Sequence, residues 1–212
     1  MSLRWIAAFA ALVLIAGLGV SRVATIRHGA PTPRDQIGVE RTLLVVPHIR
    51  QEALLCVPTS AAMIMAYYGD PQPPRRLKTL TLGRQYDAQA SFHDFSVTPF
   101  RELVRAVGSL GYGWSQETYP DTPEGFAKGI ARIEGELREG RPVMADVSLG
   151  AVGHTVVIAG FDARRRELFI VDPDMAAPGR RTVPYDRFEP LWNEHATGGR
   201  FRAIVLTRRK AI

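Results

Sequence analysis

The sequence predicts an α+β domain, with helices in its first half and an antiparallel sheet in its second half. Two segments repeat apolar residues at helical spacing. The C-terminal half instead contains short runs rich in Val, Ile and Phe that Gly, Asp and Pro turns separate. With 212 residues, of which 46% are hydrophobic and 23% charged, the chain is long enough to bury one sizeable core. This composition excludes disordered and fibrous proteins.

The N-terminal region is predicted to be a targeting segment followed by a linker. Trp5–Val20 is an uncharged apolar run near the start of the chain, as in a secretory signal or a membrane anchor. It is short beside the roughly 20 residues that a bilayer core requires, and the flanking Lys and Arg residues do not favour export. We expect residues 1–24 to be a signal or an anchor, with a buried helix as the alternative. Residues 25–41 would be a linker to one domain over 42–212.

That domain begins with a short strand and a buried helix. Residues 42–49, "TLLVVPHI", predict a strand that ends at Pro47. The following segment, "RQEALLCVPTSAAMIMAYYG", predicts a helix from Pro58 to Tyr68 that a glycine closes. Residues 77–95 are polar and are expected to be mainly loop, with one short helix.

Two amphipathic helices follow. Thr98 is expected to cap the first, with Pro99 at its first helical position and apolar residues at helical spacing as far as residue 110. The second is predicted over Pro123–Glu139, and residues 111–122 between the two helices are expected to be a loop.

From residue 141 onward the pattern changes from helical to extended. "FDARRRE" lies between two of the expected strands and predicts a hairpin turn. The strands are expected in "RPVMADVSL", "GHTVVIAGFD", "RELFIVDPD", "RRTVPY" and "FRAIVLTRR".

Charge and cysteine content exclude further classes. The net charge of +6 comes from short basic clusters at the ends of apolar runs. Such clusters are typical of solvated loops, and no nucleic-acid motif accompanies them, so no nucleic-acid partner is expected. A chain with one cysteine forms no internal disulfide, and the core alone must stabilise this domain.

The single cysteine, Cys56, precedes the predicted helix. A lone cysteine is often a small core residue, but a helix N-terminus favours negative charge and hence a thiolate. Gln51 lies on the approach to Cys56, where its amide can join the Cys56 N–H in binding an oxyanion. These two residues are therefore candidates for nucleophile and oxyanion donor.

A thiol nucleophile requires a base, and His154 is the candidate among the histidines at 28, 48, 93, 154 and 195. It is expected at the first residue of an apolar strand, although a structural histidine is the alternative. If residues 154–160 and 167–172 form a hairpin, Asp172 lies beside His154 and can orient the imidazole. Asp174 and Asp162 are substitutes, and Asp172 alone is equally compatible with a turn residue.

The segments that carry these residues resemble the papain-like cysteine peptidases, and within them the bacteriocin-processing type, family thirty-nine, as a stand-alone domain. The similarity covers about residues 43–207 and implies a helical part that carries the cysteine, packed on an antiparallel sheet that carries His and Asp. It implies Cys56 as nucleophile, His154 as general base, Asp172 as orienting residue and Gln51 as oxyanion donor. Val57 departs from the family, where glycine usually follows the cysteine.

The resemblance implies a peptidase that needs no metal or other cofactor and acts on peptide or protein substrates. No transporter or ATPase portion is recognisable, so cleavage after a double glycine is not implied. Two alternatives stay open. One is amidase or acyl-transfer chemistry on cell-wall or peptide-linked substrates, and the other is a non-catalytic papain-like domain that binds extended peptide.

Overall fold

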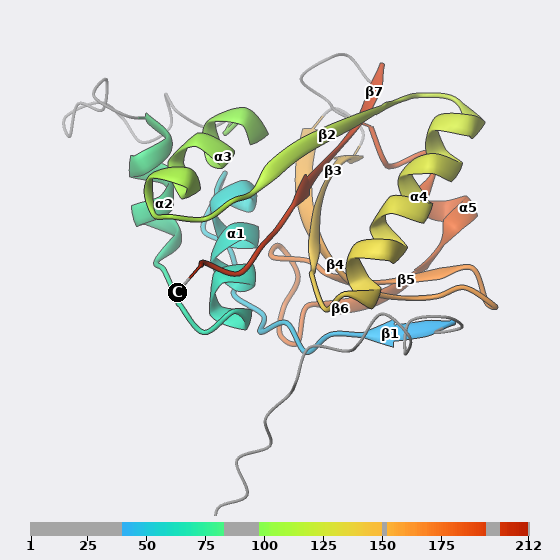
Figure 1. Ribbon diagram of the computed structural model, residues 1–212, viewed down its shortest axis with the longest axis horizontal. Coiled ribbons are helices and arrows are strands. Elements are labelled where there is room, and N and C mark those ends of the chain that lie inside the picture. The colour runs from blue at the N-terminus through green and yellow to red at the C-terminus, as the bar shows by residue number, and fades with distance from the viewer. Residues whose placement is uncertain (1–39, 83–97, 150–151, 194–199, 212) are drawn as a thin grey trace, which may run out of the picture. The chain divides into compact units, whose positions relative to one another are not determined.

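The computed structural model describes residues 40–82, 98–149, 152–193 and 200–211. The predicted signal or anchor over 1–24 and nearly all of the predicted linker lie outside these residues. In the described part, an antiparallel sheet of seven strands lies between two groups of helices (Figure 1). No described helix combines the length and apolar character needed to cross a membrane.

The sheet has the strand order β2-β7-β3-β4-β5-β6, and β1 pairs with the end of β4. Every pairing is antiparallel, so the expected antiparallel sheet is confirmed. The strands are β1 (Arg41–Leu43), β2 (Ser115–Pro120), β3 (Val143–Leu149), β4 (Val152–Asp162), β5 (Glu167–Val171), β6 (Arg180–Pro184) and β7 (Phe201–Leu206).

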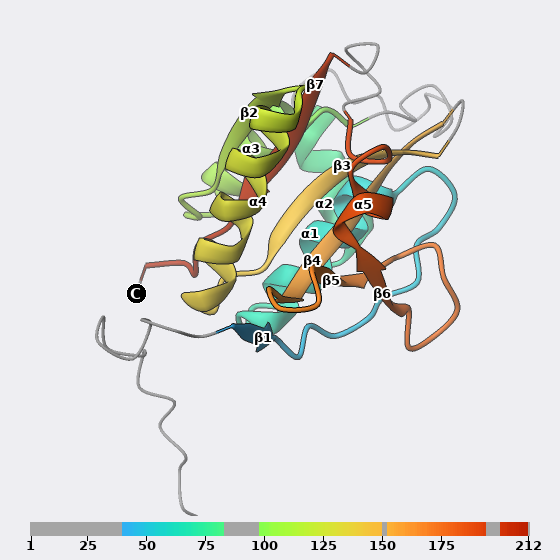
Figure 2. The same ribbon diagram turned by 90° about the vertical axis from the view of Figure 1, so that its right-hand side faces the viewer.

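Helices cover both faces of this sheet. The helices α1, α2 and α3 lie on one face, and α4 and α5 lie on the other (Figures 1 and 2). Their bounds are α1 (Cys56–Tyr67), α2 (Pro74–Leu82), α3 (Phe100–Ser109), α4 (Pro123–Arg138) and α5 (Tyr185–Phe188). The α+β prediction, with the cysteine on a helix packed against the sheet, is therefore confirmed.

Two apolar cores hold the layers together because strand side chains alternate between the faces. On the α1 face, Val157 and Val171 pack against the buried side of α1. On the opposite face, Ile158 and Ile170 pack with the apolar stripe of α4. The apolar side chains of α4 belong to this second core, which confirms the amphipathic helix that their spacing predicts.

Three local predictions are wrong. The strand expected from residue 42 to Pro47 is shorter than predicted: β1 ends at Leu43, and the chain then runs toward α1. Residues 111–122 are not all loop, since they contain β2, which pairs with β7. Thr98 is not the cap of α3: Pro99 is the cap residue, no side chain caps this helix, and the Thr98 hydroxyl accepts a hydrogen bond from Lys78 instead.

The predicted hairpin between the fourth and fifth strands is confirmed. β4 and β5 pair antiparallel from Asp162 opposite Glu167 to Val157 opposite Val171. The beginning of β4 therefore lies beside the end of β5. His154 is the third residue of β4 rather than the first, because the strand starts at Val152.

Candidate active site

Cys56 is the first residue of α1. The preceding residue, Leu55, occupies the cap position, and no side chain caps the first turn. The first backbone N–H groups of a helix have no partner within the helix, and the helix dipole favours negative charge beside them. The side chain of Cys56 is half-buried against the core of the α1 face, and its thiol is free of any disulfide. Cys56 consequently combines the support of a buried helix with access to solvent.

His154 and Asp172 meet at adjacent strand ends. His154 Nε2 lies 2.8 Å from Asp172 Oδ1, and both residues are buried, with exposed fractions of 6% and 3%. A buried His–Asp contact this short fixes the imidazole in one orientation. Because Nε2 is engaged by the carboxylate, Nδ1 is the nitrogen that remains for Cys56.

His154 interacts electrostatically with both Asp172 and Cys56. Burial by itself lowers the pKa of His154, but hydrogen bonds to Asp172 and Cys56 and the negative charge of both groups raise that pKa to about 9. The pKa of Asp172 is held below its usual range despite burial, mainly through its hydrogen bond to His154. These interactions therefore favour the imidazolium form of His154 at neutral pH.

Asp172 has further partners that hold its carboxylate in place. Arg181 Nη2 lies 3.1 Å from Asp172 Oδ2, and the backbone N–H of Asp174 donates to Asp172 Oδ1 over 3.0 Å. Arg181 belongs to a basic cluster that is expected to be solvated, so no pattern in the sequence indicates this role. Its position depends on β6 pairing with β5, which is a contact of tertiary structure.

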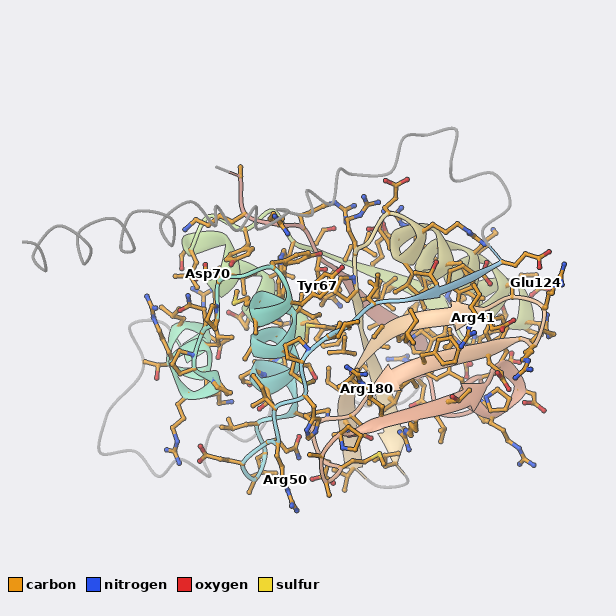
Figure 3. All side chains as sticks on the ribbon, turned by 90° about the horizontal axis from the view of Figure 1, so that it is seen from below. Arg41, Arg50, Tyr67, Asp70, Glu124 and Arg180 are labelled. Carbon is orange, nitrogen blue, oxygen red and sulfur yellow. The ribbon has the colours of Figure 1, made fainter. Side chains whose placement is uncertain are left out.

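Residues 46–51, between β1 and α1, form hydrogen bonds with residues 172–180, which follow β5 and begin β6. The His48 ring contacts the Asp172 carbonyl at 3.1 Å, and an Arg180 guanidinium nitrogen donates to the Val46 carbonyl over 3.3 Å. In Figure 3, Arg180 lies beside the chain that leads from β1, and Arg50 points away from the body of the domain. Gly179 is required here, because its φ is +62° and a Cβ would overlap the His48 ring.

Gln51 is attached to the same segment at two points. Its backbone N–H donates to the Pro173 carbonyl over 2.8 Å, and its side-chain Nε2 donates to Asp174 Oδ1 over 3.2 Å. Its Oε1 atom is buried and has no hydrogen-bond partner. The loop that leads into Cys56 is therefore bonded directly to the residues that follow Asp172.

A buried lysine also interacts with this site. Lys78 on α2 is 2% exposed, and its ammonium donates to the Thr98 hydroxyl over 2.7 Å. Burial lowers the pKa of Lys78, and electrostatic interaction with Cys56 offsets part of this effect. No clear pattern in residues 77–95 indicates this contact.

The structure thus brings His154, Asp172 and Cys56 together and places Gln51 beside the residues that follow Asp172. The two substitutes for Asp172 have other side-chain partners. The Asp174 carboxylate binds Gln51, and Asp162 lies at the far end of β4, beside Arg41 of β1. The histidines at 28, 93 and 195 lie outside the described residues. Among the residues that are described, no cluster of three or more His, Cys, Asp or Glu side chains is arranged to bind a metal.

A surface cavity of about 320 Å³ lies to one side of this arrangement, and neither Cys56 nor His154 lines it. Of its lining residues, Val171 precedes Asp172 in the chain and Arg181 forms an ion pair with the Asp172 carboxylate. Its lining is Leu43, Leu44, Ala159, Phe169, Ile170, Val171, Arg180, Arg181 and Thr182.

Comparison with known proteins agrees with this architecture. The peptidase domain of Streptococcus ComA, described as a bifunctional ABC transporter of a quorum-sensing pathway, has a TM-score of 0.51 at 18% identity and matches 76% of this chain and 97% of its own. Xylellain, a cysteine protease from Xylella fastidiosa, has a TM-score of 0.50 at 10% identity and matches 85% of this chain and 90% of its own. These likenesses show a papain-like fold.

A double-glycine-motif protease from an AMS/PCAT transporter, solved with a leader peptide, has a TM-score of 0.49 at 23% identity, and the match covers 79% of this chain and 95% of that one. No curated protein matches the chain. The model of the Peptidase_C39 like family matches residues 43–199, which is most of the chain. The protein therefore belongs to the Peptidase_C39 like family and is a cysteine peptidase of the papain-like type.

Proposed function

We propose that the protein hydrolyses peptide bonds with Cys56 as nucleophile, His154 as general base and acid, Asp172 as orienting residue, and Gln51 as oxyanion donor. One observation carries this proposal. The His154 imidazole is hydrogen-bonded to Asp172 through Nε2 at 2.8 Å and interacts with Cys56 as well. This is the order of contacts that a thiol nucleophile, its base and the group that orients the base require.

The reaction follows from these contacts. The Cys56 thiolate adds to the scissile carbonyl, and the oxyanion that forms accepts hydrogen bonds from the Cys56 N–H and the Gln51 amide. The His154 imidazolium then gives its proton to the leaving amine as the C–N bond breaks. Water adds to the thioester while His154 removes one of its protons, and collapse of this second intermediate releases the acid and regenerates Cys56.

Peptide cleavage tests the proposal. Purified protein is incubated with a degenerate peptide pool, and the products are identified by mass spectrometry. We expect the unmodified chain to cleave a subset of the pool. Cys56→Ala and His154→Ala should each lose at least about 1,000-fold in rate. Asp186→Ala removes an exposed carboxylate from α5, on the opposite face of the sheet, and serves as the matched control. Cleavage that persists in Cys56→Ala refutes the assignment of the nucleophile.

We also propose that residues 1–24 attach the protein to a membrane or direct its export, since Trp5–Val20 is uncharged and apolar. Fractionation of cells that produce the full chain or a chain that starts at residue 25 tests this. The full chain is expected with membranes or the cell envelope, and the shortened chain in the soluble cytosolic fraction. An identical distribution of the two would refute the proposal.

A further inference from the structure

The side-chain amide of Gln51 is held in one orientation by an acidic residue. Gln51 Nε2 donates to Asp174 Oδ1 over 3.2 Å, although the two residues are 123 positions apart in the sequence. A carboxylate accepts hydrogen bonds but donates none, so only the NH₂ end of the amide can face it. Turning the amide by 180° would place Oε1 against the carboxylate and leave both groups without a donor.

This orientation leaves the oxygen of the Gln51 amide without a hydrogen-bond partner. Gln51 Oε1 is buried and has no hydrogen-bond partner. A buried acceptor without a donor is unfavourable and is rare in folded proteins. The amide therefore keeps this orientation because other contacts impose it. The contact with Asp174 uses one of the two N–H groups and leaves the other free to bind an oxyanion.

Backbone contacts fix Asp174 relative to both Gln51 and Asp172. The Gln51 N–H donates to the Pro173 carbonyl over 2.8 Å. The Asp174 N–H donates to Asp172 Oδ1 over 3.0 Å, and the Asp172 N–H donates to the Gly179 carbonyl over 2.7 Å. One short segment after β5 thus holds the orienting acid of the proposed triad and the partner of the proposed oxyanion donor.

We propose that Asp174 is a positioning residue that directs the Gln51 amide so that an N–H group, rather than the carbonyl oxygen, faces the developing oxyanion. This inference rests on the proposed function. Asp174 acts through Gln51 and touches no reacting atom. Its removal should therefore lower kcat, because the oxyanion forms only after binding, while KM stays the same.

Four variants test the inference with the peptide that the unmodified protein cleaves fastest. Gln51→Ala should lower kcat about 100-fold to 1,000-fold. Asp174→Ala should lower kcat about tenfold with KM unchanged. Asp174→Asn retains a carbonyl oxygen as acceptor and should recover most of that loss. The double variant Gln51→Ala with Asp174→Ala should lose no more than Gln51→Ala alone.

Two readouts separate positioning from structural damage. Asp174→Ala should leave the rate of Cys56 alkylation by iodoacetamide unchanged, because the thiol and His154 are untouched. Asp186→Ala should leave kcat unchanged. Losses that add in the double variant, or an Asp174→Asn variant as slow as Asp174→Ala, overturn the inference alone. Failure of the unmodified protein to cleave any peptide overturns the proposed function, and this inference with it.

Discussion

Replacing Asp172 by Asn should destabilise the imidazolium form of His154. The environment of His154 raises its pKa from 6.5 to about 9. This raised pKa corresponds to on the order of 3 kcal/mol in favour of the charged form. Burial opposes the charged form, and the hydrogen bonds and negative charges of Asp172 and Cys56 together outweigh it. Since Asn retains the acceptor but removes the charge, we expect the pKa to fall by roughly one unit, a tenfold change in the ionisation equilibrium.

Alkylation of Cys56 measures this change. The chain has one cysteine, so iodoacetamide labels a single site. The rate should rise with pH in two steps, the first when the thiolate–imidazolium pair forms and the second, near pH 9, when His154 loses its proton. Asp172→Asn should move the second step toward neutral pH and slow alkylation at pH 7. His154→Ala should leave a single step, because no imidazole then titrates beside the thiol.

Protonation of His154 also contributes to the stability of the folded protein, because its pKa is raised. A raised pKa of His154 means that the folded protein binds this proton more tightly than the unfolded chain. The stabilisation is complete below pH 6.5 and is lost as the pH rises through about 9. Peptide hydrolysis should also decline above about pH 9, because His154 then lacks the proton that it gives to the leaving amine. If the second step stays at the same pH in Asp172→Asn, the carboxylate does not stabilise the imidazolium, and the reasoning is wrong.

Three further predictions follow from buried and crowded positions. Glu136→Gln should lower the free energy of unfolding by on the order of 3 kcal/mol in urea titrations, since three arginines surround this fully buried carboxylate. Despite burial, hydrogen bonds to Arg141 and Arg208 and the charges of these arginines hold the pKa of Glu136 below its usual value of 4.5. Its contribution is therefore complete above pH 4.5 and is lost as the pH falls through the lower pKa of the folded protein, and a destabilisation that does not shrink with falling pH would contradict this. Gly179→Ala should lower both thermal stability and peptidase activity, because the new methyl group overlaps the His48 ring, and full retention of both would refute the required close approach. Lys78→Met should slow the alkylation of Cys56 at pH 7 about threefold to tenfold, and an unchanged rate would exclude an electrostatic role.

The amphipathic helices and the hairpin were predictable because their signals are local. Apolar spacing identifies α3 and α4, and the turn between the apolar runs of β4 and β5 places His154 near Asp172. β2 could not be recognised, because "SQETYP" is largely polar and half-exposed and becomes a strand through pairing with β7, far away in the sequence. The Thr98 hydroxyl likewise binds Lys78 in place of its own helix.

The active site likewise combines residues with local sequence signals and contacts that only the fold creates. Cys56 and His154 carry local signals, namely a helix start and an apolar strand. The contacts of Arg181 with Asp172 and of Asp174 with Gln51 depend on how β6 and the residues after β5 are placed by the fold. No periodicity in the sequence encodes such contacts. Residues of these types, seen in sequence alone, are typical of exposed turns.

The proposed mechanism requires Cys56 to become acylated during peptide hydrolysis. Rapid acid quenching during turnover of the peptide pool, followed by mass spectrometry of the intact protein and its fragments, measures this directly. We expect a mass increase equal to the N-terminal cleavage product less one water, located on Cys56 and absent from Cys56→Ala. Hydrolysis without any adduct on Cys56, at the same rate in Cys56→Ala, would contradict it.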